Sequence, residues 1–221
     1  MAEKAKVQLA LDFLTIADAL KIAEKAAEYA DFIEAGTPLI KAEGLSVVRR
    51  LKERFPDKII VADMKTMDTG FLEAEIAFKA GADAVSVLGA ADRETIKGAS
   101  EAAKKYGKIL MVDSIGIDDI SALAEKIMDI HADYLVLHTG IDQQHAGKSA
   151  FSVLAKIKDK RLNSKIALCG GLNSYSIKKL PPVPKVDLLV IGGAITRSSD
   201  PQKAAEMIRK AINEPHKGHG L

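Results

Sequence analysis

The chain has 221 residues, a formal net charge of +2 and a hydrophobic fraction of 48%, enough to build a sizeable core in one large α/β domain or two small ones. Acidic and basic residues are interspersed, which argues against an extended nucleic-acid surface, and no apolar run approaches the roughly 20 residues of a membrane span. The single cysteine, Cys169, permits no intramolecular disulfide, and the N-terminus has no signal-peptide pattern. We therefore expect a cytoplasmic protein that binds neither nucleic acid nor membranes.

Eight short apolar runs recur at intervals of about 25 residues, as strands of parallel βα units do. The predicted strands are Val7–Asp12, Phe32–Gly36, Ile59–Asp63, Ala84–Leu88, Ile109–Asp113, Tyr134–His138, Ile166–Cys169 and Leu188–Ile191.

The segments between them carry apolar residues at three- and four-residue spacing, which predicts amphipathic helices. The predicted helices are Ala17–Tyr29, Leu45–Phe55, Leu72–Ala80, Glu94–Tyr106, Ile120–Ile130, Ala150–Lys160 and Pro201–Ile212. In the last of them, Asp200 is a suitable N-cap before a proline in the first turn.

A finer repeat lies within this pattern. Every second strand is preceded by an aspartate, and the strands between are preceded by a lysine. The aspartates are Asp31, Asp83, Asp133 and Asp187, and the lysines are Lys6, Lys58, Lys108 and Lys165. The chain therefore reads as four βαβα quarters of about 50 residues each.

Eight evenly spaced strands favour a closed (β/α)8 TIM barrel over an open doubly wound sheet, which would usually space its strands less evenly. Nothing in the composition marks a second domain. We expect one barrel domain over residues 1–213 and a flexible tail over 214–221.

The segment Asp63–Asp68, DMKTMD, follows an apolar run directly. Because side chains alternate along a strand, Asp63 and Lys65 are expected on one face of its end. Asp68, one short loop beyond, is expected to complete a charged cluster. Packing alone is a poor reason to keep such a cluster. The segment therefore predicts a site that moves protons or holds an anionic intermediate.

Barrel active sites lie at the carboxyl ends of the strands, where Asp12, Glu34, Asp113 and His138 are also expected. Asp12 could instead be a helix N-cap before Thr15. An ionised Glu34 inside an apolar run needs either a buried ion pair or a divalent metal. With Asp63 and Asp113 nearby, an all-oxygen site would suit Mg2+ or Mn2+ better than zinc, and we favour the metal.

Two glycine pairs follow the last two strands, Gly170-Gly171 and Gly192-Gly193. Barrels frequently bind phosphate in these two loops, where bare backbone N–H groups face the anion. A lone pair is usually only a turn, but two pairs in these positions indicate a phosphate site. Arg197 is either a further contact to this anion or a solvent-facing side chain.

His138 ends the sixth strand. A lone histidine is commonly a satisfied core residue, but at this rim general acid–base chemistry is favoured. Cys169 lies in an apolar run with no base marked near it in the sequence, so packing is its expected role.

Together these features resemble the orotidine-5′-phosphate decarboxylase superfamily, and within it the 3-hexulose-6-phosphate synthases. The resemblance runs from about Val7 to Ile212. The stretches that carry it are Leu9–Asp12 (LALD), Glu34–Lys41 (EAGTPLIK), Ala62–Asp68 (ADMKTMD), His138–Gln144 (HTGIDQQ) and Gly192–Thr196 (GGAIT).

The resemblance implies a reversible, Mg2+-dependent aldol reaction of formaldehyde with D-ribulose 5-phosphate, which gives D-arabino-3-hexulose 6-phosphate through a 1,2-enediolate. It implies Glu34 and Asp63 as metal ligands and Lys65 as the ammonium that stabilises the enediolate. It also implies a homodimer with shared active sites, in which Asp68 acts across the interface. The remaining implied roles are proton transfer by His138 and Asp68, hydroxyl orientation by Asp12 and Asp113, and phosphate binding by Gly170, Gly171, Gly192 and Gly193.

The nearest alternative is 3-keto-L-gulonate-6-phosphate decarboxylase, which resembles the synthases in its metal, lysine and enediolate. That family has arginines where this chain has Ile141 and Gly193, so both positions favour the synthase. Orotidine-5′-phosphate decarboxylase itself is metal-free and leaves Glu34 without a role. A non-catalytic barrel that binds a sugar phosphate is the alternative from a different class.

Overall fold

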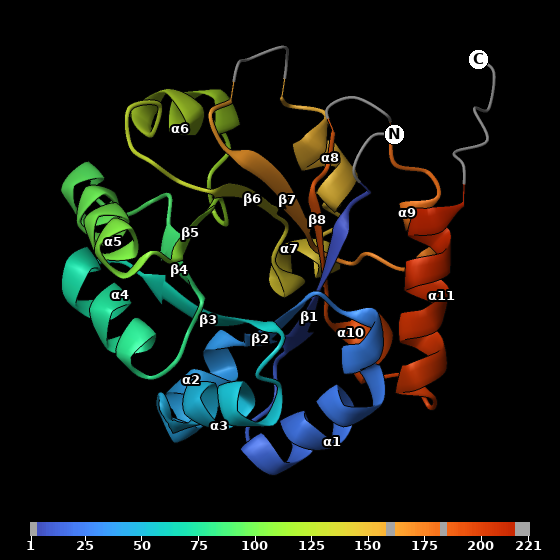
Figure 1. The fold of residues 1–221 in the computed structure, drawn as a ribbon. Helices are drawn as coiled ribbons and strands as arrows, with labels where there is room; N and C mark the ends of the chain where they lie inside the picture. Colours follow the sequence, from blue (N-terminus) through green and yellow to red (C-terminus); the bar gives the residue numbers. More distant parts are fainter. Residues whose placement is uncertain (1–3, 158–161, 182–184, 215–221) are drawn as a thin grey trace.

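The computed structural model describes residues 4–157, 162–181 and 185–214. Its strands form one closed parallel barrel in the order β1 to β8, which confirms the predicted (β/α)8 fold (Figure 1). The strands are β1 Lys6–Leu11, β2 Phe32–Ala35, β3 Ile59–Thr66, β4 Ala84–Leu88, β5 Ile109–Asp113, β6 Tyr134–His138, β7 Lys165–Cys169 and β8 Leu188–Ile191.

Helices surround the barrel in Figure 1. The longer ones correspond to the predicted segments. They are α1 Ile16–Ala26, α3 Ser46–Arg54, α4 Gly70–Lys79, α5 Arg93–Tyr106, α6 Ile120–Lys126, α8 Ala150–Leu154 and α11 Pro201–Asn213. None of the helices within the described residues is long and apolar enough to cross a membrane.

Several short helices are absent from the sequence prediction. They are the 3-10 turn η1 Ala27–Tyr29, which the prediction had included in the first helix, and α2 Thr37–Glu43, α7 Ile141–His145, α9 Ser174–Ile177 and α10 Gly193–Thr196. Elements of one or two turns are too short to show a helical period. The predicted end of the sixth long helix at Lys160 and most of the predicted tail, residues 215–221, lie outside the described residues.

The fourfold sequence repeat corresponds to a repeated hydrogen bond at the amino-terminal end of the barrel. One carboxylate oxygen of each repeat aspartate accepts the backbone N–H of a residue on the preceding odd-numbered strand. The pairs are Asp31 with Val7 at 2.8 Å, Asp83 with Ile60 at 3.0 Å, Asp133 with Leu110 at 2.9 Å and Asp187 with Ile166 at 3.0 Å. The carboxylates thus satisfy N–H groups near the amino ends of the odd strands. The periodic aspartates therefore serve the scaffold, while the chemistry belongs to the opposite end.

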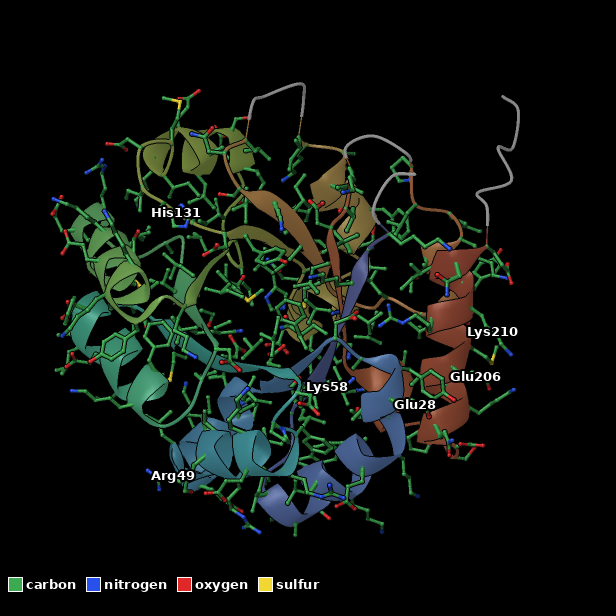
Figure 2. All side chains as sticks on the ribbon, in the orientation of Figure 1. Glu28, Arg49, Lys58, His131, Glu206 and Lys210 are labelled. Atoms are coloured by element: carbon green, nitrogen blue, oxygen red, sulfur yellow. The ribbon has the colours of Figure 1, made fainter. Side chains whose placement is uncertain are left out.

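The core has two layers. Inside the barrel, Phe32, Met111 and Tyr134 pack with smaller side chains and fill the interior below the carboxyl ends. A larger layer of Leu, Ile, Val and Ala lies between the strands and the helices. Charged side chains such as Arg49 and Lys210 lie on the outer surfaces of the helices (Figure 2). The filled interior leaves room for ligands only at the carboxyl rim, as in other barrels.

Candidate active site

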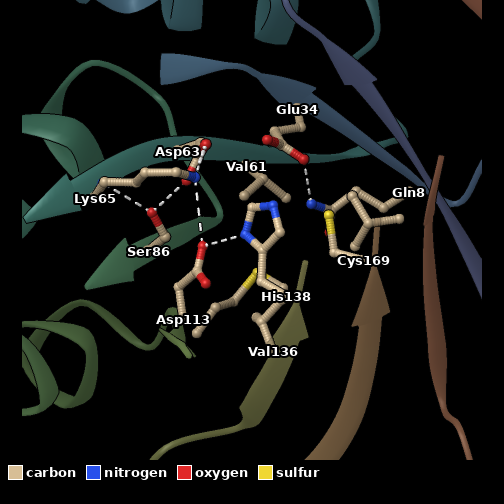
Figure 3. A pocket seen from close by; sticks show the side chains of 12 residues that line it. Gln8, Glu34, Val61, Asp63, Lys65, Ser86, Asp113, Val136, His138 and Cys169 are labelled. Carbon is tan, nitrogen blue, oxygen red and sulfur yellow. Dashed lines mark hydrogen bonds and ion pairs between the residues drawn. The ribbon is translucent and has the colours of Figure 1, made fainter. Parts of the chain in front are cut away.

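Side chains from every strand line one pocket at the carboxyl end of the barrel (Figure 3). The pocket encloses about 310 Å³, part of it continuous with solvent. Its lining residues are Gln8, Glu34, Val61, Asp63, Lys65, Ser86, Met111, Asp113, Val136, His138, Cys169 and Val190. The pocket thus gathers five of the predicted site residues, namely Glu34, Asp63, Lys65, Asp113 and His138.

Lys65 lies in a local irregularity of β3. The pairing of β3 with β4 changes register between Ala62 and Thr66, and Lys65 has a φ of +46°, a left-handed conformation that is uncommon outside glycine. The Ser86 hydroxyl accepts the Lys65 N–H at 2.9 Å and donates to Asp63 Oδ1 at 2.6 Å. Bulges of this kind re-aim side chains beside active sites. Asp63 and Lys65 share the pocket as expected, but through an irregular strand end.

The Lys65 ammonium lies between two carboxylates. Its Nζ is 2.6 Å from Asp63 Oδ2 and 3.3 Å from Asp113 Oδ2. Burial alone would lower the pKa of Lys65, but the negative charges of Asp63, Asp113 and Glu34 outweigh it and raise that pKa above its usual range. Lys65 is therefore a fixed cation in the pocket rather than a neutral amine.

His138 is held in its protonated form. Its Nδ1 lies 2.8 Å from Asp113 Oδ2. Burial lowers the pKa of His138, but the Cys169 sulfur and Asp113 more than offset this and raise the pKa to about 11. Burial also raises the pKa of Cys169, so its thiol is neutral near pH 7 and Asp113 is the anion that keeps the proton on His138 there. An imidazolium in a pocket is a ready proton donor.

Glu34 is the carboxylate with the least compensation. It is 6% exposed, and its one printed side-chain partner among the described residues is Gln8, whose Nε2 donates to Oε2 at 2.5 Å. Burial and the charges of Asp63 and Asp12 raise the pKa of Glu34 to about 8. The alternative of a buried ion pair for Glu34 therefore finds no support in the described part of the chain.

This charge balance fits a divalent cation. Four carboxylates (Asp12, Glu34, Asp63 and Asp113) face two cations (Lys65 and His138). In the described ranges, no three His, Cys, Asp or Glu side chains are arranged to hold a metal together. Mg2+ is typically held by one or two carboxylates and keeps positions for water and substrate oxygens. The Glu34–Asp63 pair suits that mode of binding.

Asp12 lies at the rim between two glycine turns. A Cβ on Gly36 would clash with Asp12 Oδ1, and one on Gly192 would lie 3.9 Å from Oδ2. The side chain remains open to solvent on one side, yet partial burial and the charge of Asp63 raise the pKa of Asp12. The alternative role as an N-cap is wrong, because Thr15 caps α1.

Both glycine pairs lie at the same end of the barrel, in the loops after β7 and β8. Gly170 and Gly171 have φ values of +123° and +65°, which side chains rarely adopt. Gly193 begins α10, and a Cβ there would clash with Nη2 of Arg197. The Arg197 guanidinium thus occupies the space over Gly193, beside the predicted phosphate loop.

Asp68 is the predicted site residue that the structure does not bring into the cluster. It is exposed and does not line the pocket. Its printed side-chain hydrogen bond, within the described residues, is with the N–H of Thr69 at 2.7 Å. The expectation that Asp68 completes the cluster within one chain is therefore wrong.

A family model described as "Orotidine 5'-phosphate decarboxylase / HUMPS family" matches residues 5–208. The chain belongs to this family. The resemblance inferred from the sequence is thereby confirmed.

Relatives within the decarboxylase/HUMPS family include a protein named 3-hexulose-6-phosphate synthase from Mycobacterium gastri, 46% identical over 94% of this chain and 99% of its own length. A crystal structure of a 3-hexulose-6-phosphate synthase has a TM-score of 0.89 at 46% identity and covers 94% of this chain and 99% of its own. A sugar-phosphate complex of KGPDC from Streptococcus mutans has a TM-score of 0.88 at 28% identity and covers 95% of this chain and 97% of its own.

Sequence reasoning missed three polar residues of this site in the decarboxylase/HUMPS barrel: Gln8, Thr37 and Ser86. Thr37 donates to Asp63 Oδ2 at 2.8 Å, and Ser86 joins Asp63 to the backbone of Lys65. A lone polar residue in an apolar strand was the available signal for Gln8 and Ser86, the same signal that singled out Glu34. Cys169, expected only to pack, lines the pocket because it pairs with His138 across β6 and β7.

Proposed function

We propose that this chain is a 3-hexulose-6-phosphate synthase, which joins formaldehyde to D-ribulose 5-phosphate in a reversible, Mg2+-dependent aldol reaction and acts as an aldehyde-lyase in reverse. The observation that carries the proposal is the Lys65 ammonium, fixed between Asp63 and Asp113 and facing the uncompensated Glu34 in one pocket. The proposal is also supported by the family and by the relatives that bear this name.

The pocket suits an intermediate that carries negative charge. Glu34 and Asp63 would hold Mg2+, with Mn2+ as a substitute, and the metal would supply Lewis-acid stabilisation of developing oxyanions. Lys65 places a second, permanent positive charge where the 1,2-enediolate forms. Because preorganised charge needs no rearrangement during the reaction, such stabilisation is usually the largest contribution to catalysis.

The proton transfers balance with the remaining residues. A proton leaves C1 of ribulose 5-phosphate to give the enediolate, C1 then bonds to the carbon of formaldehyde, and the formaldehyde oxygen becomes a hydroxyl by taking a proton. His138 is protonated near pH 7 and donates that final proton. Asp68 is assigned as the base that removes the first one. Asp12 and Asp113 orient the sugar hydroxyls.

The substrate phosphate is assigned to the loops after β7 and β8. Their glycines, Gly170, Gly171, Gly192 and Gly193, leave backbone N–H groups uncovered by side chains. Arg197, with its guanidinium over Gly193, adds a positive charge. The complex of the Streptococcus mutans protein supports a sugar phosphate as the ligand class.

A homodimer with shared active sites accounts for the position of Asp68. The residue is exposed, and so are three nearby apolar side chains: Met67 (55%), Leu72 (56%) and Ile76 (41%). A symmetric partner packed on this apolar face would bury it. Asp68 would then contribute to the pocket of the neighbouring subunit.

The decarboxylase that acts on 3-keto-L-gulonate 6-phosphate is the competing activity for the same pocket. It is disfavoured because Ile141, which is 56% exposed, and Gly193 replace the arginines that the resemblance to that family would require.

One assay tests the proposal. The protein is freed of metal, and formaldehyde consumption with ribulose 5-phosphate is followed with EDTA, with Mg2+ and with Mn2+. We expect consumption that depends on both substrates and on the metal. Decarboxylation of 3-keto-L-gulonate 6-phosphate without formaldehyde consumption would indicate the competing enzyme, and phosphate binding without either turnover would indicate a non-catalytic barrel.

A further inference from the structure

Gln8 is a buried polar residue in the middle of β1 whose hydrogen bonding is incomplete. It is 3% exposed and reaches from β1 toward Glu34 on β2 (Figure 3). Its Nε2 donates to Glu34 Oε2 at 2.5 Å, whereas its Oε1 has no hydrogen-bond partner in the described part of the chain. A buried amide carbonyl that lacks a donor is unfavourable.

Packing does not explain why this position is polar. The neighbouring residues Val7 and Leu9 are buried and apolar, and an apolar side chain at position 8 would remove the unpartnered carbonyl. Gln8 instead lines the pocket together with Glu34 and Asp63. An unpartnered acceptor that lines a pocket points to a ligand that brings the missing donor.

The two acidic side chains assigned to the metal are held in different ways. Asp63 accepts hydrogen bonds from Thr37 and Ser86 and pairs with Lys65. Glu34 has the single printed hydrogen bond from Gln8, given the residues described. The orientation of Glu34 therefore depends on Gln8 far more than that of Asp63 depends on any one neighbour.

We propose that Gln8 is a positioning residue for the cation site. Its amide N–H holds Oε2 of Glu34, which leaves Oε1 of Glu34 for the cation. Its carbonyl accepts a hydrogen bond from a water molecule that accompanies the cation. The inference rests on the proposed function, because it takes Glu34 and Asp63 as the cation ligands. It adds a residue that orients a ligand, and such residues matter nearly as much as the ligands themselves.

The test is a titration of the metal-free protein with Mn2+, with free Mn2+ followed by electron paramagnetic resonance and no substrate present. Gln8→Met keeps the length of the side chain and removes both polar groups. We expect the dissociation constant to rise about 10- to 100-fold. Gln8→Asn, which withdraws the amide by one methylene, is expected to weaken binding in the same direction and serves if the methionine variant does not fold.

Thermal unfolding in EDTA separates positioning from a structural role. Because Gln8→Met removes the unpartnered carbonyl, we expect its melting temperature without metal to equal or exceed that of the wild type. Ser100→Ala is the matched control: it removes a buried hydrogen bond to His131 far from the pocket, so it should lower the melting temperature and leave Mn2+ affinity unchanged.

The outcomes distinguish this inference from the proposed function. If the wild type and Gln8→Met bind Mn2+ equally tightly, or if the variant melts well below the wild type in EDTA with unchanged affinity, the role of Gln8 is refuted. If the wild type takes up no Mn2+ at all, the proposed metal site itself fails. A weakened variant beside an unaffected Ser100→Ala supports the inference.

Discussion

Asp113 and His138 are joined across adjacent strands by a contact of 2.8 Å between Oδ2 and Nδ1. The same carboxylate oxygen lies 3.3 Å from the Lys65 ammonium. One buried anion, itself 3% exposed, thus holds both cations of the pocket. Its pKa is lowered because the hydrogen bond and charge of His138 and the charge of Lys65 outweigh its burial. Asp113 therefore sets the protonation state of the pocket.

Asp113→Asn should return His138 to ordinary titration. In the wild type, where the pKa of His138 is raised to about 11, the imidazolium should persist from pH 5 to pH 9 in two-dimensional 15N NMR spectra of the ring. In the variant the pKa should fall toward its usual value near 6.5. His131, which is exposed, serves as an internal reference in both spectra. A His138 pKa that is unchanged in the variant would contradict the role of Asp113.

The pH dependence of stability is a second measurement of this raised pKa. The folded pKa of His138 lies above the unfolded value, so its stabilisation is complete below about pH 6.5 and is lost as pH rises toward about 11. Over that window the folded state binds more protons than the unfolded state, so the free energy of unfolding should decrease with pH. Urea unfolding at several pH values between 6 and 9 measures this slope, which should be shallower in Asp113→Asn.

Lys65→Ala should remove nearly all turnover and leave the fold intact. The ammonium is the permanent positive charge that faces the enediolate, and removal of one such group costs about 10²–10³-fold or more in rate. Lys79→Ala, which removes an exposed lysine paired with Glu75, is the control. Steady-state rates and circular dichroism of both variants are the measurements. Substantial activity in Lys65→Ala would refute the assignment.

The sequence predicts the barrel well because alternating and continuous apolar runs depend on burial, which the final fold preserves. It places Glu34, Asp63 and His138 correctly because strand ends share one rim of a barrel. It does not reveal the left-handed backbone of Lys65, since a bulge depends on pairing with β4. It also misplaces Asp68, because closeness in sequence does not determine the direction of a loop. Gln8 and Ser86 escape notice because their roles depend on partners from other strands.

Asp68→Ala and Lys65→Ala should complement each other if active sites are shared. Each variant alone should be inactive. In refolded mixtures about half of the dimers are mixed, and each mixed dimer has one pocket with both groups intact, so activity should recover to about a quarter of the wild type. If Asp68 acts within its own chain, no mixed pocket is complete and the mixture stays inactive. Activity assays before and after co-refolding decide between these outcomes.

Arg197→Met should weaken binding of the substrate phosphate. The guanidinium lies over Gly193, where it adds charge to the glycine loops, and its loss should raise KM for ribulose 5-phosphate about 10-fold, or about 1.4 kcal/mol. Inhibition by free ribulose, which lacks the phosphate, should not change. Arg93→Met removes an exposed arginine that pairs with Asp129 on the outside of the barrel and should affect neither constant. Equal KM values for Arg197→Met and the wild type would show a solvent-facing arginine.

Asp133→Ala should destabilise the barrel without altering the chemistry. Its carboxylate accepts the Leu110 N–H at 2.9 Å at the amino-terminal end, and an unpaired N–H there should cost about 1–3 kcal/mol, or a fall in melting temperature on the order of 5 °C. Asp133→Asn retains an acceptor oxygen and should lose less. Asp57→Ala, at an exposed position, is the control. KM and kcat at a temperature where all variants are folded should be unchanged, because the pocket lies at the opposite end; altered constants would contradict this separation of scaffold from site.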